Sequence, residues 1–281
     1  RPVAFMNSSE FDLEICQGDQ VTFEASSPDA GTEFEFFVNG TSVLGAGIND
    51  TLYITTGLND GDTISLQGFR FGCASDSIPF QVYTVNPLPV FTMISTDADT
   101  TICAGDLVAF TGTGGDTTSL YQYRLNGTNV TSLTLDSTYS TALLANNDVI
   151  TLFSQTSEGC TDSSFMTFNV DALPTTSLTS TELGTIICQN TNVTFTASGA
   201  TTYEFFVNGI SQGAASATTT FSTSILTAVD VVTVIGHFAN GCSFQAPQSF
   251  SYSILATPVI TMTSSDIDFI ICSGDNVTFT A

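Results

Sequence analysis

One short pattern recurs along the chain at nearly constant intervals. It reads ICQGDQVTF at 15–23, ICAGDLVAF at 102–110, ICQNTNVTF at 187–195 and ICSGDNVTF at 271–279. The cysteines that open these copies are Cys16, Cys103, Cys188 and Cys272, so the intervals are 103 − 16 = 87, 188 − 103 = 85 and 272 − 188 = 84 residues. A period of this length predicts an array of similar units in place of one large core.

A second, unrelated marker repeats with the same spacing. Proline stands in RPVAFM, LPVFTM, LPTTSL and TPVITM, at Pro2, Pro89, Pro174 and Pro258. Because two features share one set of intervals, the sequence predicts repeats over 1–88, 89–173 and 174–257, followed by the N-terminal part of a fourth repeat over 258–281. Arg1 lies at a repeat boundary, so we expect the chain to be an internal segment of a longer mature protein.

Apolar and polar residues alternate within each repeat, which is typical of β-strands that are buried on one face. In VTFEA, Val21, Phe23 and Ala25 fall on one face, and the same rule holds in FEFFVNG (34–40), YQYRLNG (121–127) and YEFFVNG (203–209). Each of these three stretches ends in Asn-Gly, a strong signal for a type I′ hairpin. About seven short strands per repeat predict an all-β fold, a tandem array of immunoglobulin-like β-sandwich domains.

The stretch FEFFVNG also places an apolar residue on the face that should meet solvent. Phe37 and Phe206 occupy this position in the first and third repeats, and Arg124 occupies it in the second. Exposed aromatic residues can mark a contact surface for carbohydrate or for a neighbouring protein. A phenylalanine here can equally be covered by its own loop or by a cross-strand partner, so both interpretations stay open.

The chain is strongly acidic, with 27 Asp and Glu residues, three arginines, no lysine and a formal net charge of −24. Such a surface repels phosphate backbones and anionic lipid headgroups. No apolar run approaches the roughly 18 residues of a membrane-spanning helix, and the first residues do not read as a signal peptide. We therefore expect neither nucleic acid as a partner nor direct membrane insertion.

The inventory of reactive side chains argues against catalysis. General acid–base or nucleophilic chemistry needs a base beside its partner, and the chain has a single histidine, His237, in one repeat only. The cysteines never approach the close Cys-x-x-Cys spacing of structural zinc sites. We expect no enzyme activity, no catalytic residues and no zinc.

The combined motifs carry a family resemblance. IC-x-GD-x-VTF, YEFFVNG, L-x-x-x-D-x-V-T, GC and a closing V-x-x-x-P linker resemble the tandem Ig-like or PKD-like repeats of giant cell-surface adhesins from Bacteroidota. These include the gliding-motility adhesins that the type IX secretion system exports. The Trp-Asp-x-Gly-Asp-Gly signature of true PKD domains is missing, which favours the Ig-like relatives, and the third copy has Asn190-Thr191 in place of Gly-Asp.

The resemblance implies an extracellular protein displayed on the cell surface. We expect a structural stalk segment of a long adhesin or filament, whose partners are the neighbouring repeats of the same chain. The loops at 40–50, 127–137 and 209–219 differ between repeats, whereas core, turn and cysteine recur, as a spacer requires. A module that binds surface glycans or other cell-surface proteins, and a self-assembling filament subunit, stay open as alternatives.

The resemblance also implies O-linked glycans. Asp-Ser/Thr followed by an apolar residue or Thr is similar to the O-glycosylation sequon of Bacteroidota. The candidate acceptors are Thr51, Thr63, Ser77, Thr100, Thr117 and Ser137. A chain this rich in Asp, Ser and Thr produces several such matches by chance.

Calcium is the only cofactor for which the sequence offers candidate ligands. Acidic residues gather ahead of the leading cysteines, and oxygen-rich clusters near a domain junction can hold Ca²⁺. The candidate ligands are Asp97, Asp99, Asp266 and Asp268, with Glu10, Asp12 and Glu182 in the other copies. The alternative is that they are outward positions of solvated strands, and the third copy keeps only one carboxylate.

The cysteine count favours an oxidising location, with two cysteines per complete repeat plus Cys272. Pairing within a repeat, by analogy with antibody domains, would give Cys16–Cys73, Cys103–Cys160 and Cys188–Cys242. Strand order argues against it. The leading cysteine ends the first strand, and the Gly-Cys lies between the sixth and seventh strands, so the two fall at opposite poles. These poles are about 25 Å apart, whereas disulfide Cα atoms lie within about 7 Å.

A staggered pairing between neighbouring repeats removes this conflict. The short connector 86–89 contains two prolines and brings the C-terminal pole of one repeat to the N-terminal pole of the next. The favoured inter-repeat bridges are therefore Cys16–Cys160 and Cys103–Cys242. Cys188 and Cys272 would pair beyond Ala281, and Cys73 would pair upstream of Arg1. Pairing within repeats stays open as the alternative.

Overall fold

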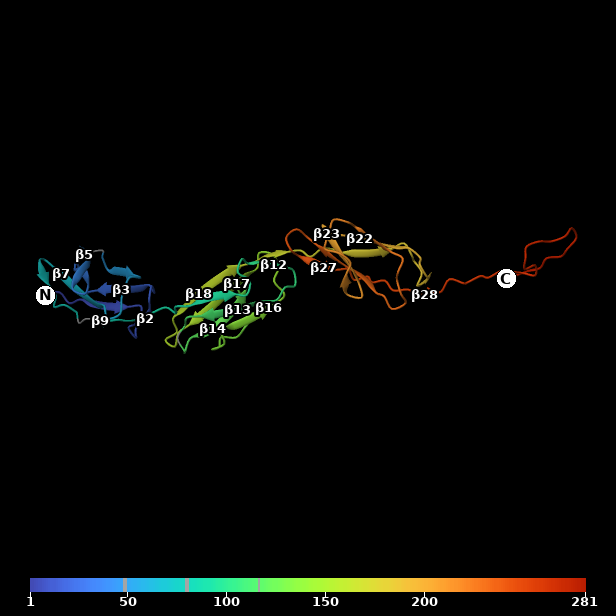
Figure 1. Cartoon of the computed structure of the whole chain (residues 1–281). Coiled ribbons are helices and arrows are strands. Elements are labelled where there is room, and N and C mark those ends of the chain that lie inside the picture. The colour runs from blue at the N-terminus through green and yellow to red at the C-terminus, as the bar shows by residue number, and fades with distance from the viewer. Residues whose placement is uncertain (48–49, 79–80, 116) are drawn as a thin grey trace. The chain divides into compact units, whose positions relative to one another are not determined.

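The structure is a computed structural model that describes residues 1–47, 50–78, 81–115 and 117–281. These residues form strands, turns and bends, and none of them is helical (Figure 1). None of the described residues therefore forms a helix long and apolar enough to cross a membrane. The chain divides into two compact units, Arg1–Val170 and Asp171–Ala281. The predicted all-β, immunoglobulin-like fold is confirmed by the strands and their pairing, described next.

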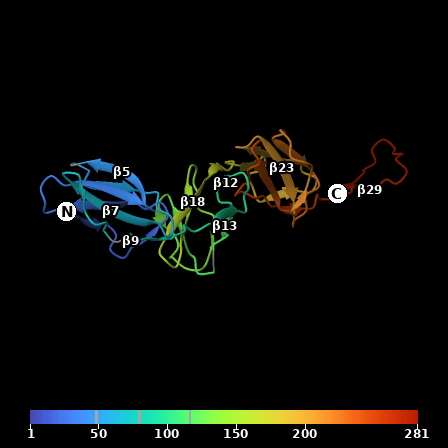
Figure 2. The same ribbon diagram turned by 90° about the vertical axis from the view of Figure 1, so that its left-hand side faces the viewer.

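The first repeat is built from two antiparallel sheets. One has the order β1-β3-β6, and the other has the order β5-β4-β7-β8 with β9 beside β7; β5, β7 and β9 are labelled in Figure 2. The strands are β1 (Phe5–Ser8), β2 (Glu14–Cys16), β3 (Val21–Ser26), β4 (Glu33–Val38), β5 (Thr41–Gly47), β6 (Leu52–Thr55), β7 (Thr63–Arg70), β8 (Cys73–Ala74), β9 (Gln81–Val82) and β10 (Thr84–Asn86).

The second repeat follows the same plan. Its sheets have the orders β11-β13-β16 and β15-β14-β17-β18. The strands are β11 (Thr92–Ser95), β12 (Thr101–Cys103), β13 (Val108–Thr113), β14 (Leu120–Leu125), β15 (Thr128–Asn129), β16 (Thr138–Thr141), β17 (Val149–Gln155), β18 (Thr161–Thr167) and β19 (Asn169–Asp171).

The third repeat has sheets in the orders β20-β22-β25 and β24-β23-β26-β27, and the last residues contribute the pair β29-β30. The strands are β20 (Ser177–Ser180), β21 (Ile186–Cys188), β22 (Val193–Ser198), β23 (Thr202–Val207), β24 (Ile210–Ser211), β25 (Thr220–Thr223), β26 (Val232–His237), β27 (Ser243–Gln245), β28 (Ser253–Leu255), β29 (Thr263–Ser264) and β30 (Phe279–Thr280).

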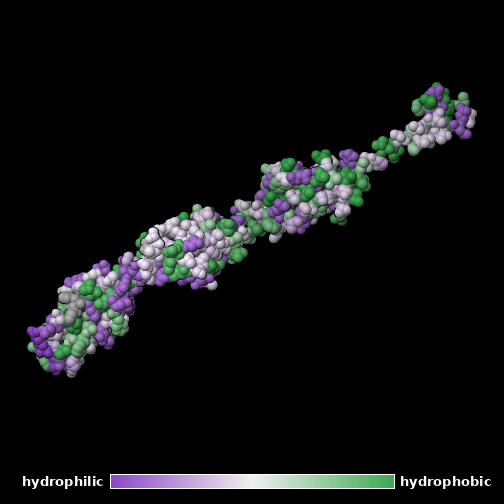
Figure 3. All heavy atoms as spheres, turned by 90° about the horizontal axis from the view of Figure 1, so that it is seen from below, coloured by the Kyte–Doolittle hydropathy of each residue, from purple (hydrophilic) through white to green (hydrophobic). Residues whose placement is uncertain are grey.

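Three separate hydrophobic clusters lie between these sheets. They span Ile15 to Val85, Met93 to Phe168 and Leu178 to Tyr252, and the predicted inward residues Val21, Phe23 and Ala25 are buried. On the surface, hydrophobic and hydrophilic residues are interspersed (Figure 3). Each cluster draws its residues from one predicted repeat. The repeat boundaries after residues 88, 173 and 257 stay predictions.

The Asn-Gly turns take the predicted backbone conformation. Asn39 and Gly40 have φ of 51° and 75°, and the other two Asn-Gly pairs are similar. The asparagine also clamps the next hairpin, because its Nδ2 donates to Asp62 Oδ1 at 2.7 Å while Thr63 N donates to its Oδ1 at 3.0 Å. The same clamp joins Asn126 to Asp148 and Asn208 to Asp230.

The first and third repeats each contain a parallel pair of strands, which the alternating sequence pattern does not predict. Strand β2 pairs in parallel with β10, with Cys16 opposite Asn86. The pairs β12-β19 and β21-β28 occupy the same place in the later repeats. The parallel pairing fixes the leading cysteine at the end of its repeat, beside the last strand before the linker.

Candidate functional site: the disulfide between repeats

The site begins with the turn that follows β2. Cys16 N donates to Asp19 Oδ2 at 2.9 Å, and Asp19 N donates to Cys16 O at 3.0 Å, which closes the turn from both sides. Gly18 between them has φ of 89°, a conformation that side chains with a Cβ rarely adopt. The Gly-Asp of the recurring motif therefore fixes the backbone that carries the cysteine.

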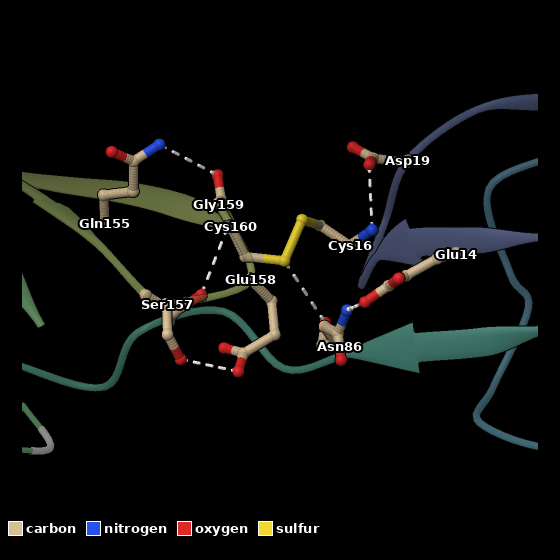
Figure 4. The surroundings of a disulfide bond; sticks show 10 residues. Glu14, Cys16, Asp19, Asn86, Gln155, Ser157, Glu158, Gly159 and Cys160 are labelled. Atoms are coloured by element: carbon tan, nitrogen blue, oxygen red, sulfur yellow. Dashed lines mark hydrogen bonds between the residues drawn. A yellow bond between two sulfur atoms is a disulfide. The ribbon is translucent and has the colours of Figure 1, made fainter. Parts of the chain in front are cut away.

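The last strand of the first repeat supports the same turn. Gln17 N donates to Asn86 O at 2.9 Å. Asn86 Nδ2 donates to Glu14 Oε1 at 2.8 Å (Figure 4). Strands β2 and β10 are thus joined by backbone and side-chain hydrogen bonds on either side of Cys16. The linker begins directly after Asn86.

The second half of the site is the hairpin between β17 and β18. Gly159 N donates to Thr156 O at 3.1 Å, Thr156 N donates to Cys160 O at 2.9 Å, and Gly159 has φ of 90°. Gln155 Nε2 adds a bond to Gly159 O at 3.3 Å. The glycine of the Gly-Cys pair therefore takes the left-handed turn, and Cys160 follows it with a fully buried side chain.

Cys16 and Cys160 form a disulfide, with Cα atoms 5.5 Å apart and a sequence separation of 144 residues (Figure 4). Cys160 Sγ also lies 3.8 Å from Asn86 O. The bridge therefore joins strand β2 of the first repeat to the β17–β18 hairpin of the second. It is the pair that the staggered arrangement predicts.

The remaining cysteines fall into two states. Cys103 and Cys242 are disulfide-bonded, whereas Cys73, Cys188 and Cys272 are free and exposed. The alternative of pairing within repeats is wrong for Cys16–Cys73, Cys103–Cys160 and Cys188–Cys242, since one cysteine of each pair is free or bonded elsewhere. The physical reason is the one expected: the two cysteines of a repeat lie at opposite ends of its strands.

The other motif copies keep the turn, and the third copy lacks one of its hydrogen bonds. Cys103 N and Cys272 N donate to Asp106 and Asp275 at 3.0 and 2.8 Å. In the third copy Asn190 takes the positive φ of glycine at 63°, and Thr191 N still donates to Cys188 O at 3.1 Å. Thr191 has no carboxylate, so the bond from the cysteine N–H to a carboxylate is absent from this described turn.

The single histidine lies beside one carboxylate. His237 Nε2 lies 3.9 Å from Glu204 Oε2 on neighbouring strands of the third repeat, with both side chains half-buried. Among the described residues, no group of three or more His, Cys, Asp and Glu side chains could hold a metal ion.

The calcium candidates serve as turn acceptors. Asp99 and Asp268 accept the N–H groups of Thr101 and Ile270 at 3.0 and 3.2 Å, and Asp266 accepts that of Phe269 at 2.7 Å. Asp97 Oδ1 is buried without a hydrogen-bond partner within the described part of the chain. Each site offers two carboxylates, whereas Ca²⁺ takes six to eight oxygen ligands. Calcium binding stays a prediction.

The predicted glycan acceptors differ in accessibility. Ser77 and Thr117 are exposed, and Thr51, Thr63, Thr100 and Ser137 are half-buried. Thr63 Oγ1 is tied to Asn39 Oδ1 at 3.2 Å, and Thr100 Oγ1 to the Asp99 carbonyl at 2.7 Å. Asp116, which precedes Thr117, lies outside the described residues. Occupancy of all six acceptors stays a prediction.

No family model matches the sequence, and no curated protein matches it. Solved structures do match. A Ca²⁺-stabilized adhesin of an Antarctic bacterium that binds ice is 17% identical over 95% of this chain and 77% of that one, with a TM-score of 0.34. A 1.5-MDa bacterial ice-binding adhesin is 14% identical over 91% and 99%, with a TM-score of 0.32. The ICAM-5 D1–D4 ectodomain fragment is 12% identical over 89% and 76%, with a TM-score of 0.40. At these values the likeness says nothing about the ligand of this chain.

Proposed function

We propose that this chain is a structural stalk segment of a long extracellular cell-surface adhesin, stiffened by disulfides between neighbouring repeats. The observation that carries the proposal is the Cys16–Cys160 bridge, which spans 144 residues and links two sandwiches with separate cores. A spacer needs repeated cores and firm junctions, and the three separate cores and the bridge between the first two repeats support this role.

The bridge would change the mechanics of the junction. A single peptide linker leaves neighbouring domains free to swing unless their interface is large. Here a second covalent connection runs beside the linker 87–89, which contains Pro87 and Pro89. Two connections at separate points remove most of the rotational freedom that one linker allows. We therefore expect the bridged junction to resist bending and pulling.

We propose that the same bridge repeats along the chain. Cys103 and Cys242 are both disulfide-bonded and correspond in motif to Cys16 and Cys160, which supports Cys103–Cys242 as the next bridge. The free, exposed Cys73, Cys188 and Cys272 would then bond to repeats outside this chain. Each junction of the stalk would carry one bridge.

The cellular setting is also a proposal. Structural disulfides persist in oxidising surroundings, so the four bonded cysteines, at least one of which lies in each complete repeat, support an extracellular location. The motif resemblance supports a gliding-motility type adhesin exported by type IX secretion and decorated on some of its six glycan acceptors. Mass spectrometry of material from the native cell tests the last point, since an intact mass equal to the bare chain would contradict glycosylation.

Peptide mapping without reduction tests the proposed bridges. Free thiols are first blocked with a maleimide, and the protein is then digested. We expect label on Cys73, Cys188 and Cys272, and linked peptides that contain Cys16 with Cys160 and Cys103 with Cys242. A linked peptide that joins Cys103 to Cys160 would overturn the stagger.

Small-angle X-ray scattering tests the stiffness separately. The double variant Cys16→Ser/Cys160→Ser should show a broader distribution of interdomain distances than the unmodified chain. Cys73→Ser is the matched control, because its thiol is free and exposed. Identical scattering from all three proteins would contradict a stiffening role.

The two alternatives make distinct predictions. A self-assembling filament subunit would sediment as a concentration-dependent oligomer, whereas a stalk segment with its thiols blocked should sediment as a monomer. A binding module would carry distinctive side chains on an open face. One repeat does carry such side chains, and they lead to a separate inference.

A further inference from the structure

The open face of the β15-β14-β17-β18 sheet in the second repeat is unusual for this acidic chain. Tyr121 and Tyr123 of β14 point into the core, so the alternate residues of the sheet lie on the opposite, outer face. That face carries no acidic residue at its alternate positions in β14, β17 and β18: Leu120, Gln122, Arg124, Val149, Thr151, Phe153, Gln155, Thr161, Ser163, Phe165 and Thr167. Asp162 pairs with the buried Ser154 and alternates to the other side.

Two substitutions separate this face from its counterparts. FEFFV in the first repeat and YEFFV in the third place Glu and Phe at the two outward positions, whereas YQYRL in the second places Gln122 and Arg124 there. One negative charge is removed and one positive charge is added at neighbouring sites of the same strand. The inward residues of this strand stay large and apolar in all three repeats. The two substitutions therefore alter the outer face of the sheet and leave the core pattern unchanged.

Arg124 is held in a fixed position on this face. Its guanidinium lies over the Phe153 ring, 4.6 Å from the centroid, and Nε and Nη2 donate to Gln122 Oε1 at 3.3 and 3.2 Å. Phe153 is also specific to this repeat, since Gln67 and Ile235 occupy its place in the others. These two bonds do not use Nη1, whose hydrogens can donate to a further acceptor.

Arg124 also differs from the other two arginines in its charge partners. Arg1 and Arg70 each form an ion pair, with Asp76 and Asp29, whereas no carboxylate among the described residues forms one with Arg124. In a chain with 27 acidic residues, a guanidinium whose contacts are an amide oxygen and an aromatic ring can accept the charge of an external carboxylate.

An exposed aromatic ring lies in the same row. Arg124 pairs with Thr151, and Thr151 pairs with Phe165, so the three stand on adjacent strands. Phe165 is 69% exposed. At about 4.8 Å per strand, Arg124 and Phe165 are about 10 Å apart, with a threonine hydroxyl between them. The row thus presents a cation, a hydroxyl and an apolar ring to one ligand.

We propose that this face binds a glycan through one carboxylated sugar residue, of the sialic or uronic acid type. The guanidinium edge takes the carboxylate, since planar N–H pairs match its two oxygens. The Phe165 ring contacts the C–H face of the adjoining sugar, and Thr151 contacts a hydroxyl. The net charge of −24 repels a polyanion, which favours a glycan with a single acidic residue.

This inference is independent of the stalk proposal, because it uses no cysteine and only one repeat. NMR titration of the full chain tests it with sialyllactose and a glucuronic acid-terminated trisaccharide, and with lactose as the neutral parent. We expect saturable binding of one or both carboxylated sugars, weakened by added salt, and no binding of lactose at the same concentrations.

Three variants locate the site. Arg124→Gln should weaken binding by about tenfold or more, because it removes the charge-assisted hydrogen bonds. Arg124→Phe should do the same and should fold, since it restores the residue of the first and third repeats. Arg1→Gln is the control, because it removes an equal charge from an exposed ion pair and should leave binding unchanged. Thermal melting checks that each variant is folded.

Several outcomes would overturn the proposal. One is that neither carboxylated sugar binds, and another is that lactose binds equally well. Unchanged binding by folded Arg124→Gln would place the site elsewhere. Equal or tighter binding of an acidic tripeptide, Asp-Glu-Asp with blocked ends, would identify the face as a contact for an acidic protein instead.

Discussion

The first and second repeats contain the same dipeptide at the same place, and the structure uses it differently. Gly72-Cys73 follows β7, and Gly159-Cys160 follows β17. Cys73 is free and exposed, whereas Cys160 is buried and bonded to Cys16. The dipeptide alone therefore does not determine the environment of the sulfur.

Loop geometry accounts for part of the contrast. In the first repeat Arg70 pairs directly with Cys73, so Phe71 and Gly72 alone form the turn, with φ of 49° and 77°. In the second repeat Gln155 pairs with Thr161, and Cys160 stays within the longer loop 156–160. The third repeat has the longer form, since His237 pairs with Ser243. The rest of the contrast comes from the neighbouring repeat, because Cys160 forms a disulfide with Cys16 in the turn that follows β2.

The largest expected effect comes from removing the bridge. Cys16→Ser/Cys160→Ser should lower the free energy of unfolding by about 4 kcal/mol, since a crosslink over 144 residues restricts the unfolded chain strongly. Denaturant unfolding measures this, and Cys73→Ser should change stability by less than about 0.5 kcal/mol. Equal effects of the two changes would remove the distinction between the two Gly-Cys sites.

The turn that presents Cys16 should show the next largest effect. Asp19→Ala removes the acceptor of Cys16 N and should cost about 1 kcal/mol. Thr191→Asp makes the reciprocal change in the third copy and should stabilise it by up to about 1 kcal/mol. Denaturant unfolding of both variants measures the pair. A gain from Asp19→Ala would show that the carboxylate does not support the turn.

Acid should weaken the Asn–Asp clamps. The backbone N–H groups of Asn59 and Thr227, and then the Asn39 and Asn208 amides, lower the pKa of Asp62 and Asp230 below its ordinary value. A depressed folded pKa contributes stability above the unfolded pKa of about 3.9, and this is lost as pH falls through the folded pKa. Asp62→Asn and Asp230→Asn should therefore show a smaller loss of stability between neutral pH and acid.

Urea unfolding across this pH range measures the effect. Glu24→Gln, an exposed change on β3, is the matched control and should follow the unmodified chain. Parallel curves for Asp62→Asn and the unmodified chain would show that the clamp carboxylates have the same pKa in both states.

Much of the fold was accessible from the sequence, and the reasons are local. The alternation in VTFEA predicts the buried Val21 and Phe23, and Asn39-Gly40 predicts its turn, because both depend on neighbouring residues. The pairing of Cys16 with Cys160 follows from strand count and linker length. The alternative of pairing within repeats rests on an analogy with antibody domains. That analogy does not take into account that the two cysteines of a repeat lie at opposite ends of its strands.

Other features depend on register, which the sequence does not reveal. Thr84 and Val85 carry no signal for parallel pairing with β2, so the sequence does not predict that Asn86 supports the Cys16 turn. The sequence distinguishes Arg124 from Phe37 and Phe206, but the stacking of Arg124 on Phe153 requires that Gln122 pair with Phe153 across β14 and β17. Phe37 and Phe206 are half-buried, so their burial favours neither an exposed contact surface nor a fully covered side chain.

The smallest expected effect lies inside the cores of the same two repeats. Tyr83 and Phe168 occupy equivalent places, each edge-on to a buried phenylalanine with ring centroids 5.7 and 5.6 Å apart. The Tyr83 hydroxyl bonds to Ser8 Oγ, and burial raises its pKa. Phe168 has no hydroxyl, although Ser95 stands where Ser8 does, at the end of the first strand.

Exchanging the two side chains tests whether this hydroxyl matters. Tyr83→Phe should lower the free energy of unfolding by about 0.5 kcal/mol, and Tyr252→Phe should match it, since Tyr252 bonds to Ser180 at 2.6 Å. Phe168→Tyr should raise stability by up to about 0.5 kcal/mol if its hydroxyl reaches Ser95, because a buried hydroxyl is favourable only when it is paired. Denaturant unfolding separates these cases. A loss of stability in Phe168→Tyr would mean that the second core is closed around the phenylalanine ring and that the two repeats differ in packing as well as in their Gly-Cys loops.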